Sequence, residues 1–263
     1  VNQPNADDQA IQAFANSQQV LNYYWTNHKR DSFDGQGAQI VNVVHIGDKW
    51  TNAFWDSENE MMAYGDGDGK KFRNLTLSLD VAGHEMTHGV VSKTANLEYQ
   101  GESGALNEGF ADFFGETIEG QKDWVMGRDL FFDVAMGENG IRNLKDPHKT
   151  TYKWQDENGD PIRKQAPASY DEIFTFGGDS CDRSNDNCGV HMNATLIGHT
   201  GYLIVSELGR DKAEKLFYNT LIHYMTETSD FHAFAKGMRE ACQATLSAAD
   251  CASADKVLTQ VGL

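Results

Sequence analysis

One stretch of sequence decides how this chain folds: Val81-Ala82-Gly83-His84-Glu85-Met86-Thr87-His88-Gly89-Val90-Val91. Its apolar flanks predict a buried helix over residues 80–93. Four residues advance an α-helix by about 400°, so His84 and His88 project from one face about one turn apart. That separation suits two ligands of one tetrahedral zinc ion. Glu85 lies about 100° further round the helix, where its carboxylate can hold a water.

The alternative for this stretch is a helix with two surface histidines. Its apolar flanks disfavour that interpretation, because buried histidines need polar partners. Gly83 directly precedes His84 and costs a helix about 1 kcal/mol relative to Ala, so we expect a loose helix here.

A third metal ligand is expected from Gly104-Ala105-Leu106-Asn107-Glu108-Gly109-Phe110-Ala111-Asp112. Glu108 and Asp112 are four residues apart on an apolar helix and share a face. Two buried carboxylates this close repel each other unless cations lie nearby. Glu108 as a zinc ligand, with Asp112 as hydrogen-bond partner of a ligand histidine, resolves the conflict. Two histidines and one glutamate leave a fourth position open, which is typical of catalytic zinc.

The composition narrows the function classes. The 263 residues carry 22 basic and 39 acidic side chains, a formal charge of −17. This charge disfavours binding to nucleic acid or to membrane surfaces, and it favours bound cations such as calcium. Solubility is the alternative explanation of the charge. The uncharged apolar runs are too short to span a bilayer.

The four cysteines form two close pairs, Cys181/Cys188 and Cys242/Cys251. Pairing of neighbours closes the shortest loops, so we prefer these two disulfides and an oxidising, extracellular setting. Four reduced thiols in a cytosolic protein remain the alternative.

Hydrophobic periodicity predicts an α+β protein. Helical spacing occupies residues 7–25, 80–93, 103–120, 191–208, 211–226 and 230–247, whereas residues 39–46 and 50–55 are typical of strands. Residues 139–188 are polar and irregular. We therefore expect a small α/β lobe, residues 1–93, followed by a mainly helical lobe, residues 94–263, with the zinc site between them.

Six motifs in order resemble the thermolysin-like zinc metallopeptidases: NAFW (52–55), GDGDG (65–69), HEMTH (84–88), YQGESGALNEGFAD (99–112), GIRN (140–143) and GVHMN (189–193). The resemblance covers nearly the whole chain and implies the two-lobed fold of that family. The chain departs from the family in its shorter β-rich segment before the first helix, so a small first lobe is expected. The resemblance also implies one catalytic zinc held by His84, His88 and Glu108.

The resemblance assigns further roles to single residues. Glu85 would activate the zinc-bound water, and Tyr99 and His191 would donate to the tetrahedral oxyanion. Asp186 would orient His191, while Asn107 and Asp112 would support the zinc ligands. For Tyr99 the alternative is a packed aromatic residue, and for His191 an ordinary histidine at a helix start.

The same resemblance predicts how substrate binds. Asn52 and Ala53 match an edge strand that pairs with the substrate backbone, and Arg142 matches a residue that holds a substrate carbonyl. An apolar pocket is implied on the carboxyl side of the scissile bond, at Phe72, Leu75, Val81, Met126 and Ile141. It predicts cleavage on the amino side of bulky hydrophobic residues such as Leu or Phe; the alternative is that these five residues are only core.

One structural calcium ion is also implied. Its ligands would be Asp80, Glu116, Glu119 and Asp123, with the Val125 carbonyl as a further oxygen. Val125 and Arg128 stand where a second, adjacent calcium would need acidic groups, so one ion is expected. A solvated acidic face is the alternative.

These expectations describe a secreted, monomeric neutral endopeptidase that acts on protein and peptide substrates and is made with a propeptide. Two alternatives belong to other classes: a catalytically inactive binding relative, and a zinc hydrolase of small molecules. All expected ligands and Glu85 are present, which disfavours the first, and the NAFW strand with its apolar pocket disfavours the second.

Overall fold

The computed structural model describes residues 7–120, 123–155, 161–176 and 180–263. Its contacts divide the chain into two compact units. The first contains residues 1–93 and 114–141, and the second contains residues 94–113 and 142–263. The expected division after residue 93 therefore coincides with the first break, but residues 114–141 return to pack with the N-terminal unit.

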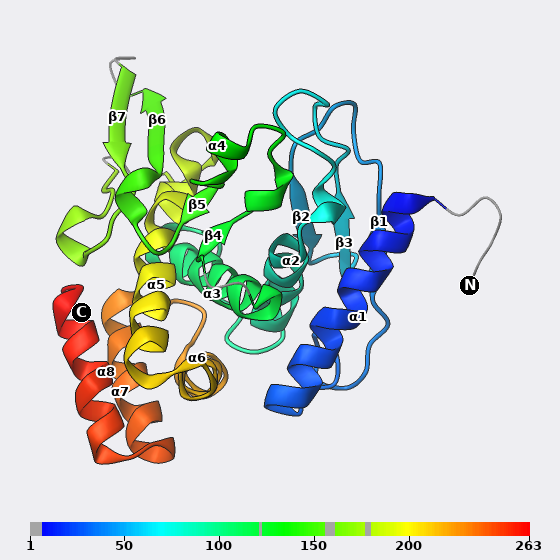
Figure 1. The fold of residues 1–263 in the computed structure, drawn as a ribbon. Helices are drawn as coiled ribbons and strands as arrows, with labels where there is room; N and C mark the ends of the chain where they lie inside the picture. The colour runs from blue at the N-terminus through cyan, green and yellow to red at the C-terminus, as the bar shows by residue number, and fades with distance from the viewer. Residues whose placement is uncertain (1–6, 121–122, 156–160, 177–179) are drawn as a thin grey trace. The chain divides into compact units, whose positions relative to one another are not determined.

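In the first unit a small sheet lies beside the first helix, α1 (Asp8–His28) (Figure 1). The sheet contains β1 (Val41–Val43), β2 (Ala53–Asp56) and β3 (Met61–Tyr64) in the order β1-β3-β2. β1 runs parallel to β3, whereas β2 runs antiparallel to it. Both predicted strands exist but are shorter than expected. A left-handed residue at His45 prevents the first from continuing, and the second begins at Ala53 rather than at residue 50.

The zinc-motif helix, α2 (Leu79–Ser92), packs beside α1 in the first unit. Nearly all of its side chains are buried, which agrees with the continuous apolar pattern around the motif. The hydroxyl groups of Tyr24 in α1 and Thr87 in α2 are hydrogen-bonded at 2.6 Å. A short 3-10 turn, Leu75–Leu77, precedes α2.

Gly83 has a packing role in addition to its cost in helix propensity. The last six residues of α3 (Gly101–Glu119) belong to the first unit and lie against α2. A Cβ atom on Gly83 would lie 3.0 Å from Ile118 Cδ1 and 3.2 Å from Gly115 Cα. A Cβ atom on Gly115 would lie only 2.6 Å from the Asp80 carbonyl oxygen. The two glycines therefore permit close contact between the helices.

The remaining elements of the first unit are short. They are β4 (Val125–Met126), the 3-10 turn Arg128–Leu130 and α4 (Val134–Gly137).

In the second unit four helices follow one another and pack side by side (Figure 1). They are α5 (Asp186–Leu208), α6 (Arg210–Tyr224), α7 (Phe231–Thr245) and α8 (Ala248–Gln260). Aromatic side chains form their core: the Phe113 ring from α3 stacks on Phe217 at 3.9 Å, and Phe110 meets Phe217 edge to face. The sequence pattern predicted α5 to α7, but it did not separate α8 from the polar end of the chain.

The second unit also contains strands within residues 139–188, which were predicted to be irregular. β5 (Arg142–Asn143) is followed by an antiparallel hairpin of β6 (Thr151–Gln155) and β7 (Pro161–Gln165). The same region contains three 3-10 turns: Pro147–Lys149, Tyr170–Glu172 and Arg183–Asn185. In β7 the half-buried positions are held by Ile162 and Lys164, so its alternation between apolar and polar residues is weak in the sequence.

Both preferred disulfides are confirmed. Cys181 is bonded to Cys188 just before the first right-handed turn of α5, and Cys242 of α7 is bonded to Cys251 of α8. None of the helices in the described ranges has the length and hydropathy needed to cross a membrane.

Candidate active site

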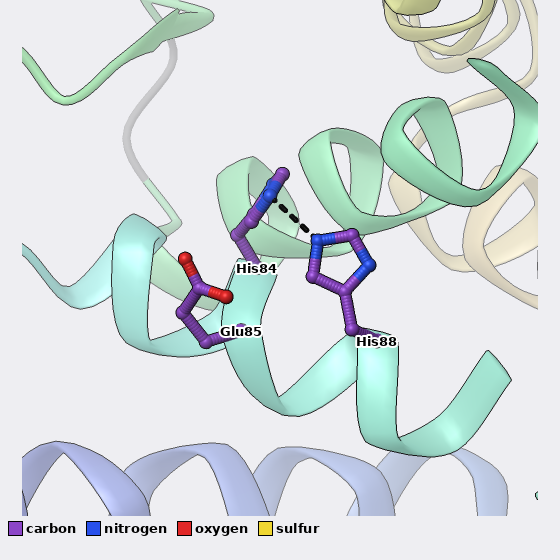
Figure 2. A group of neighbouring side chains, drawn as sticks. All are labelled: His84, Glu85 and His88. Carbon is purple, nitrogen blue, oxygen red and sulfur yellow. Dashed lines mark hydrogen bonds between the residues drawn. The ribbon is translucent and has the colours of Figure 1, made fainter. Parts of the chain in front are cut away.

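Helix α2 presents His84, Glu85 and His88 together. The Nε2 atoms of His84 and His88 face each other at 3.0 Å (Figure 2). Glu85 is buried on the adjacent part of the helix, and one ligand atom from each of the three residues lies within 4.8 Å of the others. The geometry follows directly from helical spacing, as the sequence analysis predicted.

These side chains fit a metal ion. Two ligands about 2.05 Å from a tetrahedral zinc ion are about 3.3 Å apart, close to the separation of the two Nε2 atoms. Two neutral imidazole nitrogens that face each other need one of them to carry the hydrogen, whereas a cation satisfies both lone pairs. The donor set is therefore suited to zinc.

In the second unit, Tyr99, Glu108 and His191 converge. The Tyr99 hydroxyl donates to Glu108 Oε1 and lies 3.2 Å from His191 Nε2. His191 Nε2 is also 3.4 Å from Glu108 Oε1. Glu108 is buried, whereas the side chains of Tyr99 and His191 are about two-fifths exposed at 43% and 42%. Both donors thus lie at the solvent side of a buried carboxylate.

Asp186 holds His191 at two places. Its Oδ1 lies 2.6 Å from His191 Nδ1, and its Oδ2 accepts the His191 backbone N–H at 2.9 Å. Burial alone would lower the pKa of His191, but the carboxylates of Glu108 and Asp186 raise it above its ordinary value. The arrangement therefore favours an imidazolium that donates from Nε2.

An unusual turn of backbone brings Asp186 to His191. Residues 186–189 have φ values of 56°, 48°, 64° and 81°, so they form one left-handed turn before the right-handed part of α5. Such conformations cost about 1–2 kcal/mol for each non-glycine residue. The Asn185 side chain accepts the Cys188 N–H at 2.9 Å, which helps to fix the turn. The sequence pattern gives no sign of this turn and predicts a helix that begins only near residue 191.

Arg142 and Asp112 form a buried, two-point ion pair. Arg142 Nε donates to Asp112 Oδ2 at 2.7 Å, and its Nη2 donates to Oδ1 at 2.5 Å. The same Nη2 lies 3.7 Å from Glu108 Oε2. Burial alone would lower the pKa of Arg142, but the two carboxylates raise it well above its ordinary value. The Arg142 guanidinium therefore supplies at least part of the positive charge that the close pair of Glu108 and Asp112 requires.

Asn107 and the predicted substrate strand belong to different units. Asn107 Nδ2 donates to the Leu97 carbonyl at 3.3 Å. Ala53 lies in β2, at an edge of the sheet, and Asn52 directly precedes it. β2 stands at the end of the strand order and pairs with β3, so it is an edge strand of this sheet.

The five predicted pocket residues all belong to the first unit. Leu75, Val81 and Met126 are buried, and Ile141 is partly exposed. The Ile141 N–H donates to the Met126 carbonyl at 2.8 Å, which places these two residues together. Phe72 packs its ring against Phe131 at 4.7 Å.

Three of the predicted calcium ligands also converge in the first unit. Glu116, Glu119 and Asp123 each offer an oxygen within 4.8 Å of the others. Asp123 Oδ1 is buried without a hydrogen-bond partner, while its Oδ2 accepts from Arg128. A buried oxygen of this kind, beside two more carboxylates, suits a hard cation.

Asp80 is not part of that convergent group. Its Oδ2 accepts the Gly127 N–H at 2.6 Å, and its Oδ1 accepts the Val81 N–H at 2.6 Å and the Ser78 hydroxyl. Burial raises the pKa of Asp80, and these donors oppose that effect. Asp80 therefore fixes the loop at Gly127 to the start of α2.

Comparison with known proteins gives the family. Residues 2–92 match the thermolysin metallopeptidase catalytic domain, and residues 95–262 match the alpha-helical domain of the same peptidases. The chain belongs to the thermolysin metallopeptidase family. The two matches divide where α2 ends, at Ser92. A small strand-containing N-terminal lobe and a mainly helical C-terminal lobe are thereby confirmed.

Individual relatives agree with this assignment. Bacillolysin from Brevibacillus brevis is 38% identical over 254 residues, which cover 93% of this chain but only 42% of the bacillolysin. Neutral protease NprE from Bacillus pumilus is 34% identical, over 97% of this chain and 77% of its own length. The precursor of protealysin, a metalloproteinase from Serratia proteamaculans, superimposes with a TM-score of 0.83 at 28% identity, covering 98% of this chain and 79% of that one.

Proposed function

We propose that this chain is the catalytic part of a zinc endopeptidase. The single observation that carries the proposal is the pair of facing Nε2 atoms of His84 and His88, with Glu85 beside them. We propose Glu108 as the third ligand. Membership of the thermolysin metallopeptidase family supports this ligand set.

The chain's own residues supply the proton transfers. Bound zinc would act as a Lewis acid and lower the pKa of a water molecule. Glu85 would take a proton from the attacking water and deliver it to the leaving amine. Its burial in α2 keeps the carboxylate beside the two histidines rather than in bulk solvent.

We propose that Tyr99 and His191 donate hydrogen bonds to the oxyanion that develops on the substrate carbonyl. Their hydroxyl and Nε2 groups converge from the exposed side of Glu108, and the Asp186 carboxylate at the opposite ring nitrogen of His191 favours an imidazolium with a donor at Nε2. Loss of one such donor typically costs about 10²–10³ in rate. Asp186 would keep His191 in this orientation.

Substrate recognition is proposed to use the edge of β2 and an apolar pocket. An extended peptide would add to the edge at Asn52 and Ala53 by backbone hydrogen bonds. Phe72, Leu75, Val81, Met126 and Ile141 would accept a bulky hydrophobic side chain and direct cleavage to its amino side. Equal cleavage before Asp and before Leu in a peptide library would exclude this specificity.

We also propose that the protein is secreted as a monomer with a propeptide. The two disulfides support an oxidising compartment. The comparable protealysin structure is that of a precursor, which supports maturation from a longer form.

The decisive experiment compares peptide cleavage by the wild type, Glu85→Gln and His84→Ala. Glu85→Gln should keep stoichiometric zinc, measured by atomic absorption, but lose at least about 10²-fold in kcat. His84→Ala should lose the zinc as well. Glu58→Gln, on an exposed turn, is the matched control. Cleavage by Glu85→Gln at the native rate would reject the mechanism.

One calcium ion is proposed at Glu116, Glu119 and Asp123. Calcium should raise the Tm of the wild type, because the ion binds only the folded state. Glu119→Gln should reduce that gain, whereas Glu138→Gln should leave it unchanged. The same Tm gain in Glu119→Gln as in the wild type would remove this site.

A further inference from the structure

The backbone carbonyl of His191 receives a hydrogen bond from a distant strand. Tyr152 in β6 donates its hydroxyl to this oxygen at 3.0 Å. A carbonyl oxygen has two lone pairs, so it can accept this donor in addition to a helical N–H. Burial raises the pKa of Tyr152 above its ordinary value, so the hydroxyl keeps its proton at neutral pH.

The Tyr152 ring is held in a packed aromatic cluster. It meets Phe174 edge to face at 5.8 Å, and Trp154, the next inward residue of β6, lies 5.1 Å from the same ring. Lys164 from the paired strand β7 lies over the Phe174 ring, with Nζ 4.5 Å from the ring centroid. The hydroxyl therefore has little freedom to move.

The same cluster is attached to α5 by a second link. The Asn193 side chain accepts the Phe174 N–H at 2.7 Å and donates to the Phe174 carbonyl at 3.0 Å. Asn193 lies two residues after His191, and it is buried. The hairpin, the segment at Phe174 and the start of α5 thus form one hydrogen-bonded network.

His191 is consequently fixed from two directions. Asp186 holds its N–H and its imidazole, and Tyr152 holds its carbonyl oxygen. We propose that Tyr152 is a positioning residue, which keeps the His191 main chain where the imidazole can reach the substrate oxyanion. The inference rests on the proposed function, since it assumes the oxyanion role of His191.

Tyr152→Phe tests the inference because it removes only the hydroxyl. A small displacement of a catalytic group can cost up to about 10²-fold, and a donor that is displaced rather than deleted should cost less. We expect kcat on a peptide substrate to fall about 3- to 30-fold, with KM changed less than about twofold. Affinity for a tetrahedral peptide phosphonate should fall by a similar factor, while affinity for a cleavage-product peptide should stay the same.

Two further variants separate positioning from packing. Tyr152→Leu removes the ring as well, so it should lower kcat at least as far as Tyr152→Phe. Lys153→Ala, on the exposed side of the same strand, should behave as the wild type. A double-variant cycle then asks whether Tyr152 acts through His191: in a His191→Ala background, Tyr152→Phe should change kcat less than about twofold.

Three results would overturn the inference. The first is a Tyr152→Phe enzyme with native kcat and native phosphonate affinity. The second is an unchanged effect of Tyr152→Phe in the His191→Ala background, and the third is an equal loss of affinity for phosphonate and product peptide. Failure of the proposed function looks different, because the wild type itself would then neither cleave peptides nor prefer the phosphonate.

Discussion

His45 links three separate segments of the first unit through one exposed side chain. Its Nε2 lies 2.8 Å from Asp7, which caps α1, and its Nδ1 lies 2.7 Å from Asp66 in the loop at residues 65–69. Both ring nitrogens can donate only in the imidazolium form. Hydrogen bonds to Asp7 and Asp66 accordingly raise the pKa of His45, and the hydrogen bond to His45 lowers the pKa of Asp7.

These opposite shifts define a pH window for stability. The contribution of His45 is complete below its ordinary pKa of 6.5 and is lost as the pH rises through the raised value. The contribution of Asp7 is complete above 3.8 and is lost as the pH falls through the lowered value. We expect His45→Gln to lower the Tm at pH 5.5 and to have little effect at pH 9. His223→Gln, an exposed histidine in α6, is the control; a Tm difference independent of pH would contradict the linkage.

At the scale of single residues, the sequence predicts the relative positions of those side chains that depend only on helical spacing. His84, Glu85 and His88 were placed correctly relative to one another because one helix sets their positions. The partners of His45 lie 38 and 21 residues away, so only the tertiary fold brings them together. The Tyr152 contact with His191 spans 39 residues and was missed for the same reason.

Among the elements, the contact between α2 and α3 depends on two glycines. In an isolated helix, replacing glycine with alanine would stabilise the helix by about 1 kcal/mol. Here the added methyl group would contact the neighbouring helix instead. We expect Gly115→Ala to destabilise the protein by about 1–3 kcal/mol in urea unfolding, because its methyl group would overlap the Asp80 carbonyl. Gly83→Ala should cost less, since Ile118 has a flexible side chain. A rise in stability for Gly115→Ala would show that the helices separate easily.

The two disulfides should contribute differently to activity and stability. Closing a loop of this size stabilises a fold by about 2.5 kcal/mol in the chain-entropy model. Replacing Cys242 and Cys251 with Ala should therefore lower the Tm while kcat is kept, because that bond joins α7 to α8. Replacing Cys181 and Cys188 should also lower kcat, because their bond adjoins the turn that carries Asp186. Equal kcat values in the two variants would contradict this assignment.

Helices were easier to predict than strands for a physical reason. A helix such as α7 repeats its apolar face over 15 residues, and its bounds were predicted to within two residues. The strands β1, β2 and β3 have only three or four residues each, which is too short for a period to be measured. In the β6–β7 hairpin, Tyr152 and Trp154 pack against the ring of Phe174, a partner that the local sequence does not reveal.

For the whole molecule, the formal charge of −17 should affect how substrates arrive. A field of this sign attracts cationic peptides at low ionic strength, and salt screens it over about 10 Å at 0.1 M. We expect kcat/KM for a Lys-flanked peptide to fall between about 20 and 300 mM NaCl, and that for a Glu-flanked peptide to rise. Both peptides must share the residues around the scissile bond. The same salt response for both would mean that charge does not direct binding.

The family and fold were predictable from the sequence because collinear motifs specify both lobes. The packing of residues 114–141 with the first unit was not, since a single long helix gives no local sign of where its contacts change. The roles of the zinc, calcium and substrate residues remain predictions, which the variants above test.

The left-handed run at residues 186–189 has one further consequence. Backbone that is costly in isolation forms only when its surroundings compensate for it. During folding, this segment should therefore reach its native backbone conformation late, after the disulfide between Cys181 and Cys188 has formed. Mutational tolerance should follow the same logic: Asn187 should accept Gly or Asp, whereas Val or Ile there should leave a folded protein whose histidine is misdirected.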